Sequence, residues 1–457
     1  MGLTYCCCTA AGSLCQSCLG STAEGTTGRK RSVLLLVLTI VLALWFQYSI
    51  GPAIVSQSGW AWNTFRWIPG VGKMVYNAWH EPCKAYASDE HLLEQCAGNA
   101  GVYRTTAVAT IFYLISAAAT KIKPQLNKEA WPAKYTLFGF SVFLSMFIHS
   151  APFFTGFYLW LARAGAIVFC VLQQVVLIDI AYNWNEDWVD RADQADRLEY
   201  GSGSTWLQAI VGTCVAFYVL TVTGISLLYS HFGGCSDNVW IITLTLLGVI
   251  ALTAIQLTGT EGSLLTSSVM SIYATYLAYS MVSKNPNATC NPQLGGNDSL
   301  GIAIGLTLTA ISLAWTGWSW TAEERLNVDG VQSAKPMGAP LRPSSGEANL
   351  DVPFLDPDDQ RTSGVVMETD QVMSSSSSMS GSGIWKLNIV MALISCFVAM
   401  TLTGFGTIVN LDENENAANP TVGRFNMAMI GISQWLAIGL YIWTLLAPRL
   451  YPDYEFS

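Results

Sequence analysis

The sequence predicts an all-α, polytopic integral membrane protein with about ten transmembrane helices. Three observations support this prediction. Hydrophobic residues make up 51% of the 457 residues and charged residues only 12%, about half the charged fraction of a soluble globular protein. Apolar runs long enough to cross a bilayer recur from one end of the chain to the other. Tryptophan, tyrosine and phenylalanine are plentiful, as in the aromatic belts at membrane interfaces.

A search for stretches of roughly 20 mostly apolar residues gives ten expected spans. Their approximate ranges are 33–54, 102–121, 134–151, 153–183, 205–229, 239–258, 264–282, 299–320, 384–409 and 424–447. All should be helices, because an open sheet leaves backbone polar groups unsatisfied in lipid. The first span follows three basic residues without a small-residue cleavage site, so we interpret it as a retained signal anchor.

The basic residues of the short loops predict that both termini are cytoplasmic. Positions 29–31 are basic, whereas the loops at 230–238 and 410–423 hold no lysine or arginine. Three basic residues of the first loop run against this pattern: Arg66, Lys73 and Lys84. The expected organisation is a Cys-rich cytoplasmic N-terminus (1–32), spans one to eight (33–326) with lumenal loops at 55–101, 230–238 and 283–298, a disordered cytoplasmic loop (327–383), spans nine and ten (384–447) and a cytoplasmic tail (448–457).

Sequons and cysteines agree with this orientation. The two N-glycosylation sequons begin at Asn287 and Asn297, in a loop expected to be lumenal. Four cysteines also lie in loops on that side: Cys83, Cys96, Cys235 and Cys290. Four cysteines on an oxidising side predict two disulfides. The sequence does not fix their pairing, and we favour pairing within the first two and within the last two.

Five further cysteines crowd the expected cytoplasmic N-terminus: Cys6, Cys7, Cys8, Cys15 and Cys18. Cysteines beside a membrane are typical acceptors of palmitate. The Cys15-x-x-Cys18 spacing also suits zinc, but we favour palmitoylation or membrane packing. Residues 327–383 are rich in proline, glycine, serine and acid, which predicts disorder.

The fourth span carries polar residues within the stretch VLQQVVLIDIAYNWNEDW. It stays free of proline from Phe153 to about Leu198, so as one helix it would be about 65 Å long. Such a helix either tilts strongly or extends its C-terminal third into the cytosol. Its candidate groove residues are Arg163, Gln173, Gln174, Asp179, Asn183 and Glu186. A charge at the bilayer centre costs about 3 kcal/mol on insertion scales. These residues therefore either line a hydrophilic path for lipid or solute, or form hydrogen bonds between helices.

The seventh span carries Ser267, Ser271 and Thr275 at every fourth position. Small hydroxylated residues allow close helix packing, which we favour, or they line a groove for a headgroup. Arg104, at the start of span two, is expected to extend to the lumenal interface.

Motifs of common enzyme classes are absent from the sequence: it has no G-x-S-x-G, Walker A, His-Glu-x-x-His or Gly-rich dinucleotide turn. We therefore expect no enzyme, no cofactor and no metal. His80, Glu81 and His91 share a loop with two cysteines, where we favour a disulfide over a metal site. The net charge of −9 is not a nucleic-acid signature.

Several segments together resemble the serine incorporator family. Gln173, Gln174 and Asp179 followed by Trp184-Asn185-Glu186 look like its QQ-apolar-D…WNE segment. EGSLLTSSV…YLAYS with NP…CNP, between Glu261 and Pro292, resembles a second signature. GVYR at 101–104 and WTLLAP at 443–448 resemble two smaller ones. The similarity covers nearly the whole chain, and residues 327–383 are the least alike.

The resemblance implies an all-helical fold of ten spans with a long, tilted fourth helix, in endomembranes (ER, Golgi, vacuole or endosome) or the plasma membrane. It implies two activities. The first is ATP-independent, non-selective phospholipid scrambling between leaflets, which the polar groove candidates favour. The alternative is a carrier or scaffold that promotes incorporation of serine into phosphatidylserine and sphingolipids. A small-solute transporter ranks last, because no internal repeat is visible. Expected partners are membrane phospholipids, then serine-lipid synthesis enzymes and a second copy of the chain.

Overall fold

The computed structural model describes residues 26–56, 70–123, 126, 130–198, 201–258, 263–287, 289–292, 299–314, 384–406 and 420–450. All secondary structure in these ranges is helical. Its elements are α2 (Thr26–Trp45), η1 (Phe46–Ile50), α3 (Gly51–Val55), α5 (Val71–His80), η2 (Glu81–Tyr86), α6 (Glu90–Ile122), α7 (Trp131–Ser145), η4 (Phe153–Tyr158), α8 (Leu159–Leu198), α9 (Ser204–Phe232), α10 (Ser236–Leu257), α11 (Leu264–Val282), α14 (Ile384–Leu402), η5 (Gly404–Gly406) and α15 (Pro420–Leu450). A further short apolar helix is Ser299–Ala314.

Seven helices within the described ranges are long and apolar enough to cross a membrane. They are Arg31–Val55, Glu90–Ile122, Phe153–Leu198, Ser204–Phe232, Ser236–Leu257, Ile384–Leu402 and Gly423–Ala447. The all-helical, membrane-spanning fold is therefore confirmed, whereas the count of ten is not.

The three remaining expected spans fall short for different reasons. α7 has only 15 residues, because it ends at Ser145, ahead of the turn that contains Pro152. α11 has 19 residues, but its serines, threonines and tyrosines lower its hydropathy. Most of α11 is buried among other helices, so it does not need an apolar outer face. The described part of 299–320 ends at Ala314.

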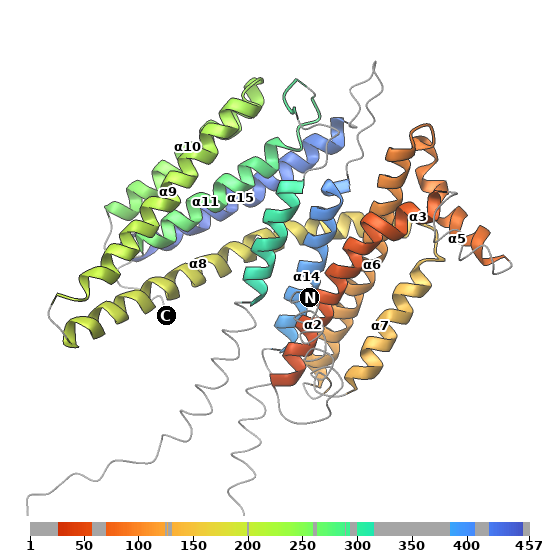
Figure 1. The fold of residues 1–457 in the computed structure, drawn as a ribbon, viewed down its shortest axis with the longest axis horizontal. Helices are drawn as coiled ribbons and strands as arrows, with labels where there is room; N and C mark the ends of the chain where they lie inside the picture. Colours follow the sequence, from red (N-terminus) through yellow and green to blue (C-terminus); the bar gives the residue numbers. More distant parts are fainter. Residues whose placement is uncertain are drawn as a thin grey trace, which may run out of the picture.

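The helices form two bundles, and α8 runs obliquely from one to the other (Figure 1). The first bundle contains α2, α3, α5, α6, α7 and α14, and the second contains α9, α10, α11 and α15. Ala166 and Phe169 of α8 belong to the first hydrophobic core, whereas Leu177, two turns further on, belongs to the second. α8 is thus the structural link between the bundles.

The predicted length of the fourth span is confirmed. Together, η4 and α8 form 46 helical residues, Phe153–Leu198, or about 70 Å at 1.5 Å per residue. The C-terminal part of α8 packs on the start of α9, where the Trp188 and Trp206 rings lie 6.1 Å apart. The exposed acidic residues Glu186 and Asp187 lie on this part of the helix.

Arg104 lies inside the first bundle, which corrects the expectation that it extends to the interface. Its side chain is fully buried, and its guanidinium donates to four main-chain carbonyls at 3.0–3.1 Å. These carbonyls belong to Ala78, Ala100, Ser145 and Ile148. Arg104 therefore satisfies backbone groups at the ends of α5 and α7, where a helix leaves carbonyls unpaired.

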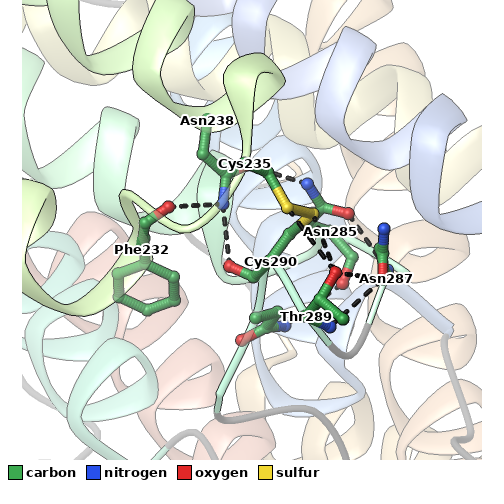
Figure 2. The surroundings of a disulfide bond; sticks show 8 residues. Phe232, Cys235, Asn238, Asn285, Asn287, Thr289 and Cys290 are labelled. Carbon is green, nitrogen blue, oxygen red and sulfur yellow. Dashed lines mark hydrogen bonds between the residues drawn. A yellow bond between two sulfur atoms is a disulfide. The ribbon is translucent and has the colours of Figure 1, made fainter.

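Both disulfides have the favoured pairing, Cys83–Cys96 and Cys235–Cys290. The second one joins the start of α10 to the loop after α11 (Figure 2). Beside it, Asn238 donates to the carbonyls of Phe232 and Cys290 at 3.1 and 2.9 Å. This network fixes the backbone that follows α11.

Candidate functional site

A pocket lies where α8 passes between the two bundles. Its cavity volume is about 30 Å³, enough for one or two water molecules. Its walls come from α8, α11, the helix Ser299–Ala314, α14, η5 and α15. Four aromatic residues make the walls mostly apolar: Tyr273, Tyr276, Phe397 and Phe405. Pockets between structural units are a common place for ligands to bind.

Gln173 is the unusual residue of this pocket. Its side chain is 1% exposed, and neither Oε1 nor Nε2 has a hydrogen-bond partner. An unpaired buried polar group costs about 1–3 kcal/mol, and such a group in a native fold requires an explanation. The adjacent Gln174 is equally buried, and its Oε1 also has no partner, but its Nε2 donates to the carbonyl of Ala437 on α15 at 2.6 Å. Gln174 therefore links α8 to α15 through a hydrogen bond. Neither polar atom of the Gln173 amide has such a partner.

Lys284 supplies charge to the pocket. It follows the C-terminus of α11 and is the one charged residue among the described residues that line the pocket. Asn291 holds the backbone here, because its Nδ2 donates to the carbonyl of Ser283 at 2.8 Å. The described lining therefore carries one basic residue and no acidic residue.

A second polar cluster shares Phe405 with the pocket. The carbonyl of Phe405 accepts a hydrogen bond from Arg163 Nη2 at 3.1 Å and another from Asn426 Nδ2 at 3.2 Å. Arg163 Nε and Asn426 Oδ1 are buried and have no partner. The rings of Trp160 and Phe425 lie 5.8 and 5.7 Å from the guanidinium carbon, within the range of cation–π attraction.

Other groove candidates on α8 lie away from both places. Asp179, Asn183 and Glu186 are exposed, and Asn183 Nδ2 donates to Asp179 Oδ1 at 3.0 Å. Among the polar groove candidates of α8, the structure thus brings Arg163 and Gln173 to the boundary between the bundles, and it leaves the acidic residues on an outer surface.

The hydroxyl residues of α11 pack against neighbouring helices. Ser267 contacts Gln256 Oε1 at 3.2 Å and the Tyr441 hydroxyl at 2.9 Å. Ser271 and Thr275 donate to main-chain carbonyls one turn earlier. All three are buried and none lines the pocket.

Sequence reasoning missed Lys284, Phe405 and Asn426. One signal was present for Phe405: the Gly404-Phe405-Gly406 triplet inside the expected span 384–409. Glycines break an apolar helix, and α14 indeed ends at Leu402, which corrects the expected end of that span. The positions of Lys284 and Asn426 depend on tertiary packing, which has no local sequence signal.

Of the candidate glycosylation and palmitoylation sites, only Asn287 lies within the described residues. Asn287 is exposed, and its Oδ1 accepts hydrogen bonds from the backbone N–H and the hydroxyl of Thr289 at 3.1 and 2.8 Å (Figure 2). Asn297, the five N-terminal cysteines and the loop 327–383 lie outside the described residues. No group of three or more potential metal ligands occurs in the described ranges.

Comparisons with known proteins agree with this architecture. The family profile described as "Serine incorporator (Serinc)" matches residues 4–454. A probable serine incorporator of Nematostella vectensis is 26% identical over 400 residues, which cover 80% of this chain and 83% of that protein. Serine incorporator 3 of Bos taurus is 24% identical over 398 residues, with 78% and 80% covered.

Serine incorporator 5 of Rattus norvegicus is 24% identical over 501 residues, which cover 100% of this chain and 98% of that protein. None of these names states a catalytic activity. The match over nearly the whole length, together with the apolar helices, establishes a multi-pass membrane protein that belongs to the serine incorporator family.

Proposed function

We propose that this protein scrambles phospholipids between leaflets without ATP and without headgroup selection, and that it does so without catalysis. The observation that carries the proposal is the pair Arg163 and Gln173, which are buried at the boundary between the bundles with unpaired polar atoms. Such groups are costly in a membrane protein and mark pathways for polar solutes or headgroups.

The physical barrier to scrambling is the transfer of a polar headgroup through hydrocarbon. Donors along a path lower that barrier, because they replace part of the headgroup's hydration. Arg163 carries a positive charge that attracts lipid phosphate, and guanidinium binds phosphate well. Gln173 offers one acceptor and two N–H donors further along α8. A passive path of this kind requires no nucleotide.

The path needs the bundles to separate. α8 is shared by both cores, and the Phe405 carbonyl connects it through Arg163 to the end of α14 and through Asn426 to α15. The hydrogen bonds to the Phe405 carbonyl are worth about 1 kcal/mol each. Replacing them with hydrogen bonds to a lipid headgroup would therefore cost little free energy. We propose that a headgroup at Arg163 loosens this connection and opens the path.

A second candidate function is a carrier or scaffold that promotes incorporation of serine into lipids. The pocket supports it, because a lysine and an unpaired amide suit a small amino acid, and the relatives are named serine incorporators. This function predicts saturable binding of labelled free serine by the purified protein.

Scrambling is tested with purified protein in sealed liposomes that carry a quenchable, headgroup-labelled lipid. Loss of all label without ATP is the expected result, because the inner leaflet then becomes accessible. Loss of only the outer half, with folded protein confirmed in the vesicles, would contradict scrambling.

Variants of Arg163 test whether this residue lies on the scrambling path. Arg163→Leu and Arg163→Gln should both slow flux at least about tenfold, which corresponds to about 1.4 kcal/mol of barrier. Arg163→Gln keeps a donor for the Phe405 carbonyl, which guards against a folding defect. Asp179→Leu, on the exposed part of the same helix, is the matched control and should leave flux unchanged. Equal flux in all variants would exclude Arg163 from the path.

A further inference from the structure

The loop after α11 is held at two points by the start of α10. At one point, Asn285 Nδ2 donates to Asn238 Oδ1 at 2.8 Å (Figure 2). At the other, the Cys235–Cys290 disulfide holds the two Cα atoms 5.2 Å apart. Four residues lie between Asn285 and Cys290, and three of them form the sequon at 287–289. The sequon is therefore a short segment between two fixed points.

Hydrogen bonds close this segment into a turn. The carbonyl of Asn287 accepts from the backbone N–H groups of Cys290 and Asn291 at 3.0 and 2.9 Å. Asn287 Oδ1 accepts from the backbone N–H and the hydroxyl of Thr289 at 3.1 and 2.8 Å (Figure 2). The Thr289 carbonyl lies against Gly234, where an added Cβ would come within 2.9 Å of it. The folded sequon is thus compact and packed on the turn that precedes α10.

The hydroxyl of Thr289 lies on the disulfide. Its Oγ1 is 3.7 Å from Cys235 Sγ and 3.8 Å from Cys290 Sγ. A hydroxyl two residues after the asparagine is required in a sequon, because the glycosyltransferase binds that hydroxyl while the asparagine amide reacts. In the folded loop the Thr289 hydroxyl instead faces the disulfide and donates to Asn287. The folded loop therefore withholds a group that the transferase needs.

Glycan transfer joins Asn287 Nδ2 to the anomeric carbon of an oligosaccharide carried on a lipid pyrophosphate. The amide loses one proton, and the lipid pyrophosphate leaves. The transferase binds its acceptor tripeptide in an extended form, at about 3.3 Å per residue. Extending residues 287–289 breaks the four hydrogen bonds of the turn, which are worth about 1 kcal/mol each. It also requires Cys290 to move away from Cys235, and only a reduced pair allows that movement.

We propose that the Cys235–Cys290 disulfide controls glycosylation of Asn287. The sequon accepts its glycan while Cys290 is a free thiol, and closure of the disulfide ends this period. Closure removes two protons and two electrons from the thiols, which a disulfide-exchange oxidant of the lumen accepts. Because Asn287 is exposed, a glycan that is already attached leaves room for closure. The two reactions compete in the new chain, so the protein exists as two glycoforms that share the same disulfide.

The test measures glycan occupancy in the full-length chain, labelled by a short radioactive pulse in cells. Every protein carries Asn297→Gln, so that only Asn287 accepts a glycan, and a glycosidase identifies the shifted band. The protein with both cysteines should give two bands. Cys235→Ser leaves the sequon and its neighbours unchanged, and it should raise the glycosylated fraction at least about twofold, because the competing disulfide no longer forms. Dithiothreitol during the pulse should raise the fraction equally when both cysteines are present and should have no further effect on Cys235→Ser.

Cys83→Ser is the matched control, because it removes the other disulfide, Cys83–Cys96, and leaves this loop intact. Its glycosylated fraction should equal that of the protein with all four cysteines and should still rise with dithiothreitol. An equal rise in Cys83→Ser and Cys235→Ser would assign the effect to general misfolding and overturn the proposal. Equal occupancy with and without Cys235, or no glycan at Asn287 in either protein, would overturn it as well. Transfer acts on the new chain, so the result does not require a stably folded Cys235→Ser protein.

Discussion

Arg163 Nη2 donates a hydrogen bond to the main-chain carbonyl of Phe405 at 3.1 Å, across 242 positions of the chain. Phe405 has a φ of 61°, in the left-handed region that a residue with a side chain seldom occupies. Its carbonyl also accepts from Asn426. One strained residue at the end of α14 is thus held from α8 and from α15 together, so three segments that are distant in the sequence meet at a single acceptor.

Because Arg163 and Asn426 donate to the same carbonyl, substitutions at the two residues should have non-additive effects on the free energy of unfolding. Arg163→Leu or Asn426→Leu alone should each cost about 1 kcal/mol of unfolding free energy, because the other donor still satisfies the carbonyl. The double variant leaves the buried Phe405 carbonyl without either donor, which adds about 1–3 kcal/mol to the loss of unfolding free energy. The double variant should therefore lose more than the sum of the two. Unfolding of the four proteins in one detergent measures this coupling, and additive losses would show that the donors act independently.

Substitutions of the two neighbouring glutamines should change stability by different amounts. Gln173→Met removes an amide that has no partner, so it should raise stability by about 1–3 kcal/mol. Gln174→Met breaks the bond to Ala437, whose carbonyl keeps its bond within α15, and it also removes the unpaired Gln174 Oε1, so stability should change by less than about 1 kcal/mol. Thermal unfolding of lipid-depleted protein measures both changes. A loss of stability in Gln173→Met would mean that the amide is bonded in solution.

The fold was largely predictable because bilayer thickness fixes the length of apolar runs. Apolar length and the absence of proline gave α8 its full extent. The sequence was less informative where tertiary contacts replace lipid as the surroundings. Most of α11 is buried among other helices, and the structure leaves its prediction as a span unconfirmed. Arg104 carries a charge in an apolar run, and four carbonyls from separate segments satisfy it.

The candidate site was predictable only in part. The polar residues of α8 stand out against their apolar neighbours, so Arg163 and Gln173 could be singled out. The distinction between Gln173 and Gln174 could not be predicted, because adjacent residues on a helix point about 100° apart and face different neighbours. Whether an amide finds a carbonyl, as Gln174 does at Ala437, depends on the packing of distant segments.

Arg104 should be essential to the first bundle. Lysine has one nitrogen and cannot reach four carbonyls, so Arg104→Lys should cost about 3–5 kcal/mol, as for other disrupted buried charges. Arg191→Lys is the control, because Arg191 is exposed and pairs with Asp187 on the surface at 2.9 Å. That change should stay within about 0.5 kcal/mol. Similar unfolding temperatures for the two variants would contradict the role assigned to Arg104.

Membrane orientation can be tested at Asn287, whose side chain is exposed. If the loop after α11 is lumenal, as the charge pattern predicts, Asn287→Gln should remove a glycan and increase mobility on a gel. Thr289→Ser preserves the sequon and should leave the glycan in place. Asn297→Gln, alone and combined, shows whether the second sequon is used. A glycan that remains in the double variant would place the modification elsewhere in the chain.

The crossing of α8 and α14 depends on Gly165. A Cβ added there would lie 2.8 Å from Cys396 Cβ and 2.9 Å from its Sγ. These distances are too short for carbon and sulfur, so Gly165→Ala should push the helices apart and cost about 1–3 kcal/mol. Gly139→Ala in α7 is the matched control, because its added Cβ meets nothing within 4 Å. An alanine there should stabilise the helix by about 0.5–1 kcal/mol. Thermal unfolding of both variants should therefore show shifts of opposite sign, and a stable Gly165→Ala protein would mean that α8 and α14 are not held this closely.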